Sequence, residues 1–189
     1  MKLSFLHRPA TWRWALCALV STIAFASTAS AFRPVATSGK ERLALGGHDV
    51  VAYHTVGKAV TGHVLYRMEW EGAVWQFQSR ENLIAFRETP KKFAPVFGGY
   101  CTVTVAKRKA TYVCSGKHFL VHQGKLYIAG SSAALKEMRK DPQAYIARAQ
   151  PTWDSWVEDY EQAQRDAADE TPAESPSAAG SANDGEAKT

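Results

Sequence analysis

The 189-residue chain lacks the short sequence motifs by which many enzymes are recognised. It has no Gly-x-Ser-x-Gly, no His-Glu-x-x-His and no glycine-rich phosphate loop, so serine hydrolases, zinc proteases and phosphate-loop enzymes have no support. No nucleophile, base and acid are grouped along the chain, and there is no internal repeat. We therefore expect no catalytic residues, and an enzyme ranks behind a binding or accessory module and a protein-interaction module.

Long apolar runs are also absent. The longest, from Ala15 to Ala26, is short for a membrane span of about 20 residues. It follows a basic start and precedes Ala29-Ser30-Ala31, a cleavage pattern typical of secretory signals. We predict a Sec-type signal at 1–31 cleaved after Ala31, a periplasmic or secreted protein, and no membrane span after cleavage.

Cysteine is scarce. Of three cysteines, Cys17 falls in the predicted signal, which leaves Cys101 and Cys114 in an oxidising compartment. A disulfide between them is the favoured prediction; it would close a loop of about a dozen residues and contribute roughly 3 kcal/mol. The alternative is a redox or metal-binding thiol pair, although no Cys-x-x-Cys is present to lower a thiol pKa.

Charge is unevenly distributed. The full chain carries +5, residues 32–160 hold 18 basic and 11 acidic side chains, and residues 161–189 hold seven acids against two bases. A basic body favours anionic ligands or surfaces, but nucleic acid is not an expected partner because the chain shows no binding motif. The Ala/Ser/Glu/Pro-rich composition of 161–189 predicts a disordered acidic tail.

The most informative stretch runs from Val64 to Cys101. Alternating apolar residues predict strands at 64–70 and 73–77 joined by a turn at Glu71-Gly72. Ser79 is a predicted N-cap for a helix that stops ahead of Pro90, and Thr89-Pro90 starts another turn. Gly98-Gly99 marks a place where the backbone needs positive φ or a close approach.

The remainder of the chain gives local signals as well. We predict the following: a strand at 102–105, a hairpin over 119–128, a helix capped by Ser131 or Ser132, a helix from Asp141-Pro142 to Pro151, and Trp153 and Trp156 folded back onto the core.

An ordered set of motifs resembles the exported YHS-domain proteins, which are mostly uncharacterised. The matching segments are Gly47-His48-Asp49-Val50-Val51-Ala52-Tyr53, Gly57-Lys58-Ala59-Val60-x-Gly62, Ser79-x-Glu81-Asn82-x3-Phe86-x3-Pro90-x-Lys92-Phe93-Ala94-Pro95-x-Phe97-Gly98-Gly99-Tyr100-Cys101 and Gly124-Lys125-Leu126-Tyr127. The resemblance covers roughly residues 43–153. It implies a small α+β module related to the metal-associated YHS modules of some copper pumps and oxygenases.

The predicted organisation follows from these signals together. It is a signal peptide at 1–31, an extended lead-in at 32–42, a YHS-like domain at 43–160 and a tail at 161–189. The predicted fold class is α+β, a small antiparallel sheet of hairpins with short helices packed on it.

A metal ligand set is the first candidate site. The resemblance implies cysteines where this chain has Ala52, Gln78 and Asn82, so an inherited thiolate site lacks its soft ligands. Histidine offers a substitute: His48, His54 and His63, with a carboxylate such as Asp49, could converge on copper, zinc or haem iron. The alternative is that His48 is a turn residue.

A small-ligand cleft is the second candidate site. Asp49, Tyr53 and Tyr100 belong to the matched motifs and could line a cleft, whereas buried tyrosines and a capping aspartate explain the same residues. The sequence therefore favours a non-catalytic binding or accessory module of the cell envelope, for a metal or small ligand. The alternative is an interaction module that docks an envelope protein through its basic face or its acidic tail.

Overall fold

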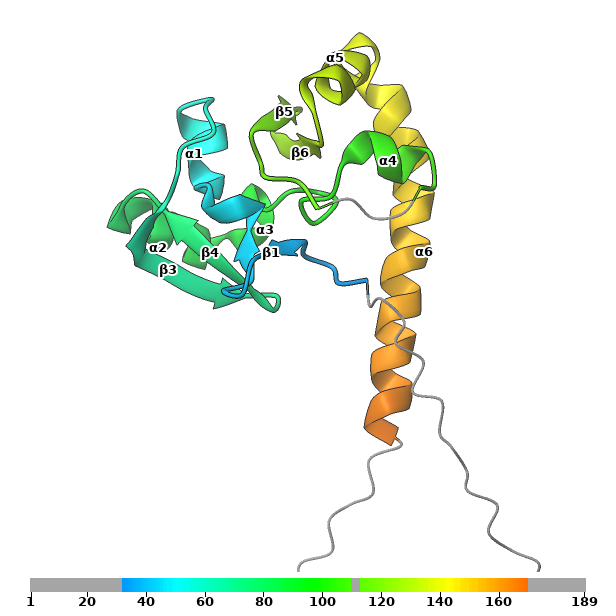
Figure 1. Ribbon diagram of the computed structural model, residues 1–189, viewed down its shortest axis with the longest axis horizontal. Coiled ribbons are helices and arrows are strands. Elements are labelled where there is room, and N and C mark those ends of the chain that lie inside the picture. The colour runs from blue at the N-terminus through cyan, green and yellow to red at the C-terminus, as the bar shows by residue number, and fades with distance from the viewer. Residues whose placement is uncertain (1–31, 110–112, 170–189) are drawn as a thin grey trace, which may run out of the picture. The chain divides into compact units, whose positions relative to one another are not determined.

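The computed structural model describes residues 32–109 and 113–169 (Figure 1). The predicted signal at 1–31, its cleavage point and residues 170–189 of the predicted tail lie outside this part. The described chain is α+β, as predicted, with a four-stranded sheet of order β1-β2-β4-β3 and a separate β5-β6 hairpin. The elements are β1 (Thr37–Ser38), β2 (Leu43–Ala44), η1 (Leu45–Gly47), α1 (Val50–Thr55), β3 (His63–Trp70), β4 (Ala73–Phe77), α2 (Arg80–Glu88), α3 (Pro90–Phe93), α4 (Thr102–Ala106), β5 (His118–His122), β6 (Lys125–Ala129), α5 (Ser132–Lys140) and α6 (Pro142–Asp169).

The sheet is mixed, and the prediction of an antiparallel sheet was wrong on this point. β3 and β4 pair antiparallel across the predicted Glu71-Gly72 turn, but β2 pairs parallel with β4 through Leu43 and Val74. The parallel pairing arises because the chain leaves β2, passes through α1, and returns along β3 before β4 inserts between them. β4 therefore lies at the centre and β3 at an edge.

One face of the sheet carries the core. Trp75 and Phe77 of β4 are buried, as their alternation predicted, and their rings lie 5.0 and 5.2 Å from the ring of Phe86 on α2. Ser79 caps α2 by accepting from the Asn82 amide, which confirms the predicted helix start. Pro90 opens α3 as predicted, but the Thr89 hydroxyl does not cap it. That hydroxyl donates to a carbonyl of the preceding helix instead.

The predicted strand at 102–105 is wrong, because this segment forms α4. The Cys101 carbonyl accepts from the amides of Thr104 and Val105, which starts the helix. Thr102, Val103 and Val105 are buried. Tertiary packing thus overrides the β-branched preference for strand.

The predicted hairpin is confirmed as β5 and β6, with His122 opposite Lys125 and a turn at Gln123-Gly124. The chain before α4 runs beside β6, since Pro95 bridges to Leu126 and Cys101 to Ile128.

The C-terminal helices follow their predicted starts but not their predicted end. Ser131 caps α5, and the Asp141 side chain accepts from an amide in the first turn of α6. Pro151 does not stop α6, which continues to Asp169 and so includes residues 161–169 of the predicted tail. Pro151 cannot bond to the Ala147 carbonyl, but Ala147 is exposed, so water can replace that bond.

The predicted lead-in is packed rather than merely extended. The ring of Phe32 lies 5.4 Å from that of Trp153 and 5.8 Å from that of Trp156, which confirms that these tryptophans contact the core. A Cβ added at Gly98 would lie 1.8 Å from the Pro34 carbonyl oxygen, and Gly98 has φ +56°. The close approach expected at Gly98-Gly99 is therefore confirmed. No helix within 32–109 and 113–169 is both long and apolar enough to cross a membrane.

Candidate functional site

Asp49 is the centre of a buried polar network rather than part of an open cleft. Its side chain has no solvent exposure. One carboxylate oxygen, Oδ1, accepts from the amides of Val51 and Ala52 at the start of α1, at 2.9 and 3.3 Å. The other, Oδ2, accepts from the Gln78 amide at 2.8 Å and from the Asn82 side chain at 2.6 Å. Asp49 thus has the capping role that the sequence offered as the alternative to a cleft, although it caps a helix, α1, that the sequence did not predict; it also ties α1 to the end of β4 and to α2.

The two tyrosines of the predicted cleft are occupied in a similar way. The Tyr53 hydroxyl donates to the Gly116 carbonyl at 2.9 Å, and the Tyr100 hydroxyl donates to the Arg33 carbonyl at 3.0 Å. Burial raises the pKa of Tyr53, and the nearby charge of Asp49 raises it further. Both rings are almost fully buried. All three residues therefore make hydrogen bonds that hold the fold together. This agrees with the alternative interpretation of the sequence, in which the tyrosines are buried and the aspartate is a cap.

The three candidate histidines are engaged separately. Nδ1 of His48 lies 2.9 Å from the Leu45 carbonyl oxygen, and Nε2 of His54 lies 3.2 Å from that of Phe93. His63 lies on β3, where its Nδ1 accepts from a backbone amide two residues further on. Within the part of the chain that the structure describes, no three histidine, cysteine or acidic side chains are grouped as metal ligands would be. The predicted convergence of His48, His54 and His63 is not found there.

Cys101 and Cys114 are brought together. An antiparallel bridge between Tyr100 and Val113 sets the two segments side by side, and both cysteines are buried. They are thiols in the structure, so the predicted disulfide stays a prediction. A hydrogen bond from Cys114 lowers the pKa of the Cys101 thiol; backbone amides lower it further, against the effect of burial.

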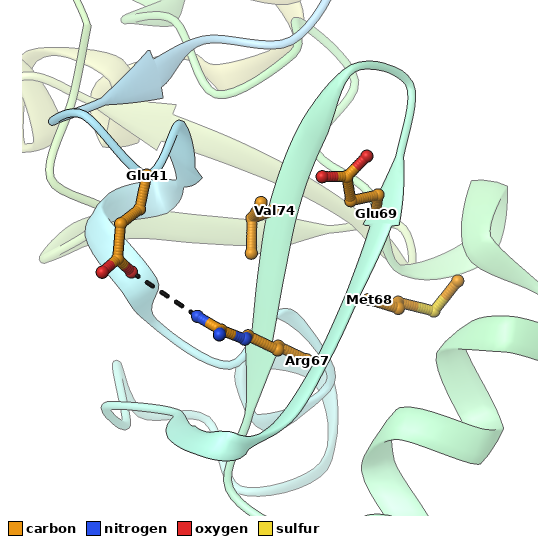
Figure 2. A pocket seen from close by; sticks show the side chains of 5 residues that line it. All are labelled: Glu41, Arg67, Met68, Glu69 and Val74. Carbon is orange, nitrogen blue, oxygen red and sulfur yellow. Dashed lines mark ion pairs between the residues drawn. The ribbon is translucent and has the colours of Figure 1, made fainter.

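An open hollow lies on the other face of the sheet (Figure 2). It measures about 440 Å³ and is lined by Glu41, Arg67, Met68, Glu69 and Val74. Arg67 points across β4 toward Glu41, and Val74 projects from β4 beside this pair, whereas Met68 points away. The register explains this arrangement: Glu69 pairs with Val74 on the open face, and Met68 pairs with Trp75 on the core face.

Two exposed ion pairs border the hollow. Arg67 lies 3.7 Å from Glu41, and Arg42 lies 3.4 Å from Glu69. The four side chains are 45–70% exposed, so their mutual attraction is weak and easily exchanged. Adjacent residues of the β1–β2 turn thus reach over the central strand to two residues of β3.

Sequence reasoning missed this hollow. The alternation of 63–70 does place Arg67 and Glu69 on one face, opposite Met68 and Trp70. What no local pattern revealed is the parallel β2–β4 pairing, which brings Glu41 and Arg42 within reach of β3.

No protein-family model, curated protein or solved structure matches the chain. The similarity to YHS-domain proteins therefore rests on the sequence motifs alone.

Proposed function

We propose that the chain is an exported, non-catalytic binding module of the YHS type, and that it binds a small ligand on the open face of its four-stranded sheet. The observation that carries this proposal is the hollow lined by Glu41, Arg67 and Glu69. The signal pattern at 1–31 supports export to the periplasm or outside, and the ordered motifs of 43–153 support the family.

The lining indicates the chemistry of the ligand. Arg67 offers a planar fork of donors that suits a carboxylate, and Glu69 can accept from an ammonium group. Each residue now has one weak, exposed partner, so a ligand that carries both charges can replace the two partners at once. Val74 provides an apolar floor. A small zwitterion fits this description: an amino acid can donate hydrogen bonds to Glu69, whereas a betaine, whose quaternary ammonium has no N–H, would be attracted to Glu69 by charge alone.

The buried candidates are weaker. Asp49, Tyr53 and Tyr100 already have structural partners, and a ligand would have to displace them at the cost of leaving buried polar groups unpaired. Metal binding by the histidines loses support for a related reason. His48 and His54 each contact a different backbone carbonyl, so a metal would have to displace these contacts.

Calorimetry with a panel of free amino acids and betaines tests the proposal. We expect saturable binding by the chain, and at least a tenfold loss of affinity in Arg67→Ala. The matched control is Arg139→Ala on α5, which removes an exposed arginine away from the hollow. Binding that is equally weakened by both variants, or unaffected by Arg67→Ala, would contradict the assignment.

An interaction module is the second candidate, favoured by one observation. β3 is an edge strand with an irregular register between His63 and Arg67, and within that segment Val64 and Leu65 are 53% and 76% exposed. Adjacent exposed aliphatic side chains are unusual and suit contact with a protein. Crosslinking in the envelope tests this: the double variant Val64→Ser, Leu65→Ser should lose a specific crosslinked partner that Arg139→Ala retains.

A further inference from the structure

Positive charge is concentrated in one part of the described chain. Residues 107–148 carry nine basic and two acidic side chains, whereas residues 32–106 carry nine basic and six acidic ones. The basic residues of 107–148 are all exposed. This part comprises the end of α4, the β5–β6 hairpin, α5 and the start of α6, and these elements pack against one another. The excess of positive charge therefore belongs to one group of packed elements.

Contacts between the three helices bring some of these cations together. Nζ of Lys107, at the end of α4, lies 2.8 Å from Oε1 of Glu137 on α5. On α6, the Tyr145 hydroxyl donates to the same oxygen, and the guanidinium carbon of Arg148 lies 4.6 Å from the centroid of the Tyr145 ring. The hydrogen bonds from the lysine and the tyrosine lower the pKa of Glu137, and the nearby charge of Lys140 on α5 lowers it further. Cations from three helices are thus grouped around one carboxylate.

The helix dipole explains only part of this arrangement. A cation near the C-terminal end of a helix is stabilised by its partial negative charge, which accounts for Lys107 and Lys140. It does not account for Arg148, which lies in the first half of α6 and packs on a tyrosine ring. Arg108 adds a fourth exposed cation next to Lys107. We call Lys107, Arg108, Lys140 and Arg148 the basic face.

We propose that the basic face docks the protein on an anionic phospholipid surface. Each Lys or Arg close to such a surface strengthens binding roughly fivefold. A bilayer suits this face better than a small anion does, because a small anion drawn to its middle would meet the carboxylate of Glu137. Separate headgroups can instead contact the long, exposed side chains one by one. The proposal is independent of the ligand site on the four-stranded sheet, with which it shares no residue.

The charge of α6 gives the docked protein an orientation. Beyond Pro151, this helix carries six acidic residues against the single basic residue Arg165. A rise of 1.5 Å per residue places its last residue, Asp169, about 30 Å along the axis from Arg148. An anionic surface attracts the basic face and repels the acidic part of α6, so the docked protein directs that part away from the bilayer.

Cosedimentation with phosphatidylcholine vesicles, prepared with and without phosphatidylglycerol, tests the proposal. The protein used begins at Phe32, the predicted product of signal cleavage; it contains the whole described core and lacks the apolar run 15–26, which has its own affinity for lipid. We expect binding only to the vesicles that contain phosphatidylglycerol, and loss of this binding as the salt concentration rises. No binding, equal binding to both kinds of vesicle, or binding that salt does not weaken would overturn the proposal.

Two double variants with the same loss of charge locate the docking surface. Lys140→Gln, Arg148→Gln removes two cations of the basic face, whereas the control Arg80→Gln, Arg87→Gln removes two exposed cations of α2. At roughly fivefold for each charge, we expect the first variant to lose at least tenfold in affinity for the anionic vesicles. We expect less than a threefold loss in the control. Equal losses would show that only the net charge matters, and would overturn the assignment to this face.

Lysine footprinting of the unsubstituted chain gives a second readout that does not depend on how the variants fold. Anionic vesicles should slow the acetylation of Lys107 and Lys140, as followed by mass spectrometry. The exposed Lys58, in the loop after α1, should react at an unchanged rate. Protection that is uniform, or that is greatest at Lys58, would contradict docking through the basic face.

Discussion

Two sets of carboxylates in this protein look alike in the sequence and differ in the structure. Asp49 has no exposure and accepts four hydrogen bonds from three elements. Glu41 and Glu69 on the open face of the sheet are 64% and 70% exposed, and each is paired with one exposed arginine. A carboxylate whose lone pairs are all used holds the fold, whereas one with a single weak partner is free to exchange it for a ligand.

The comparison shows that a residue in a matched motif is not necessarily free to bind a ligand. Asp49, Tyr53 and Tyr100 stand in the matched motifs, which made them the obvious ligand candidates. Their surroundings explain the same motif through folding, because each fixes a distant backbone segment. The candidate binding face consists instead of residues such as Arg67 and Glu69 that lie outside those motifs.

Replacing Asp49 should produce the largest effect. Asp49→Ala leaves the buried amide of Val51, and the partly buried amide of Gln78 and side chain of Asn82, without their acceptor. Each unpaired buried group costs about 1–3 kcal/mol, so we expect a loss of about 3 kcal/mol or more in the free energy of unfolding. Urea denaturation measures it, with Glu69→Ala as the control. Equal losses in the two variants would contradict the distinction between a carboxylate that holds the fold and one that does not.

Removing a single donor from the same network should reduce the free energy of unfolding by less. Asn82→Ala removes the 2.6 Å bond to Asp49 but leaves Oδ2 its bond from the Gln78 amide. We expect about 1–2 kcal/mol less stability, again by urea denaturation. A loss that matches that of Asp49→Ala would mean that the network depends on Asn82 rather than on the carboxylate.

On the open face, stability and binding should separate. Glu69→Ala breaks an exposed pair with Arg42, which is worth at most about 1 kcal/mol. The same variant should lose most of its affinity for a zwitterion, because the acceptor for the ammonium group is gone. Parallel denaturation and calorimetry measure both effects. A variant that binds normally would remove Glu69 from the proposed site.

The smallest effect is expected at His54, whose burial is intermediate between that of Asp49 and that of Glu69. Burial holds the pKa of His54 below its ordinary value of 6.5, against the effect of its bond to the Phe93 carbonyl. The unfolded chain therefore takes up the proton at higher pH than the folded chain, and stability falls as the pH drops below about 6.5. Melting temperatures between pH 7.5 and 5 should fall less steeply for His54→Gln. An unchanged slope would show that another group dominates.

The sequence predicted what is decided locally. The caps at Ser79 and Ser131 and the β5–β6 hairpin are each set by a few neighbouring residues, and all are present; the capping role of Asp49, given as an alternative, is present too, but in a helix that was not predicted. The burial of the two aromatic residues of β4 was also predicted, from the alternation of apolar and polar residues.

What the sequence could not predict depends on contacts between distant segments. Thr102–Ala106 became helical because its β-branched side chains pack in the core, and α6 continued through Pro151 because Trp153 and Trp156 contact the core beyond it. The hollow depends on the parallel β2–β4 pairing, which places Glu41 beside Arg67 although 26 positions separate them in the sequence. Such pairings leave no local signature.

Titration of ¹⁵N-labelled protein with glycine betaine and free amino acids, followed through backbone amide resonances, tests the central claim most directly. We expect the perturbed amides to centre on Arg67, Glu69 and Val74, and the perturbation to disappear in Arg67→Ala. Perturbations centred on Asp49 and the amides it holds, or none with any zwitterion, would contradict the assignment of the binding site to the open face of the sheet.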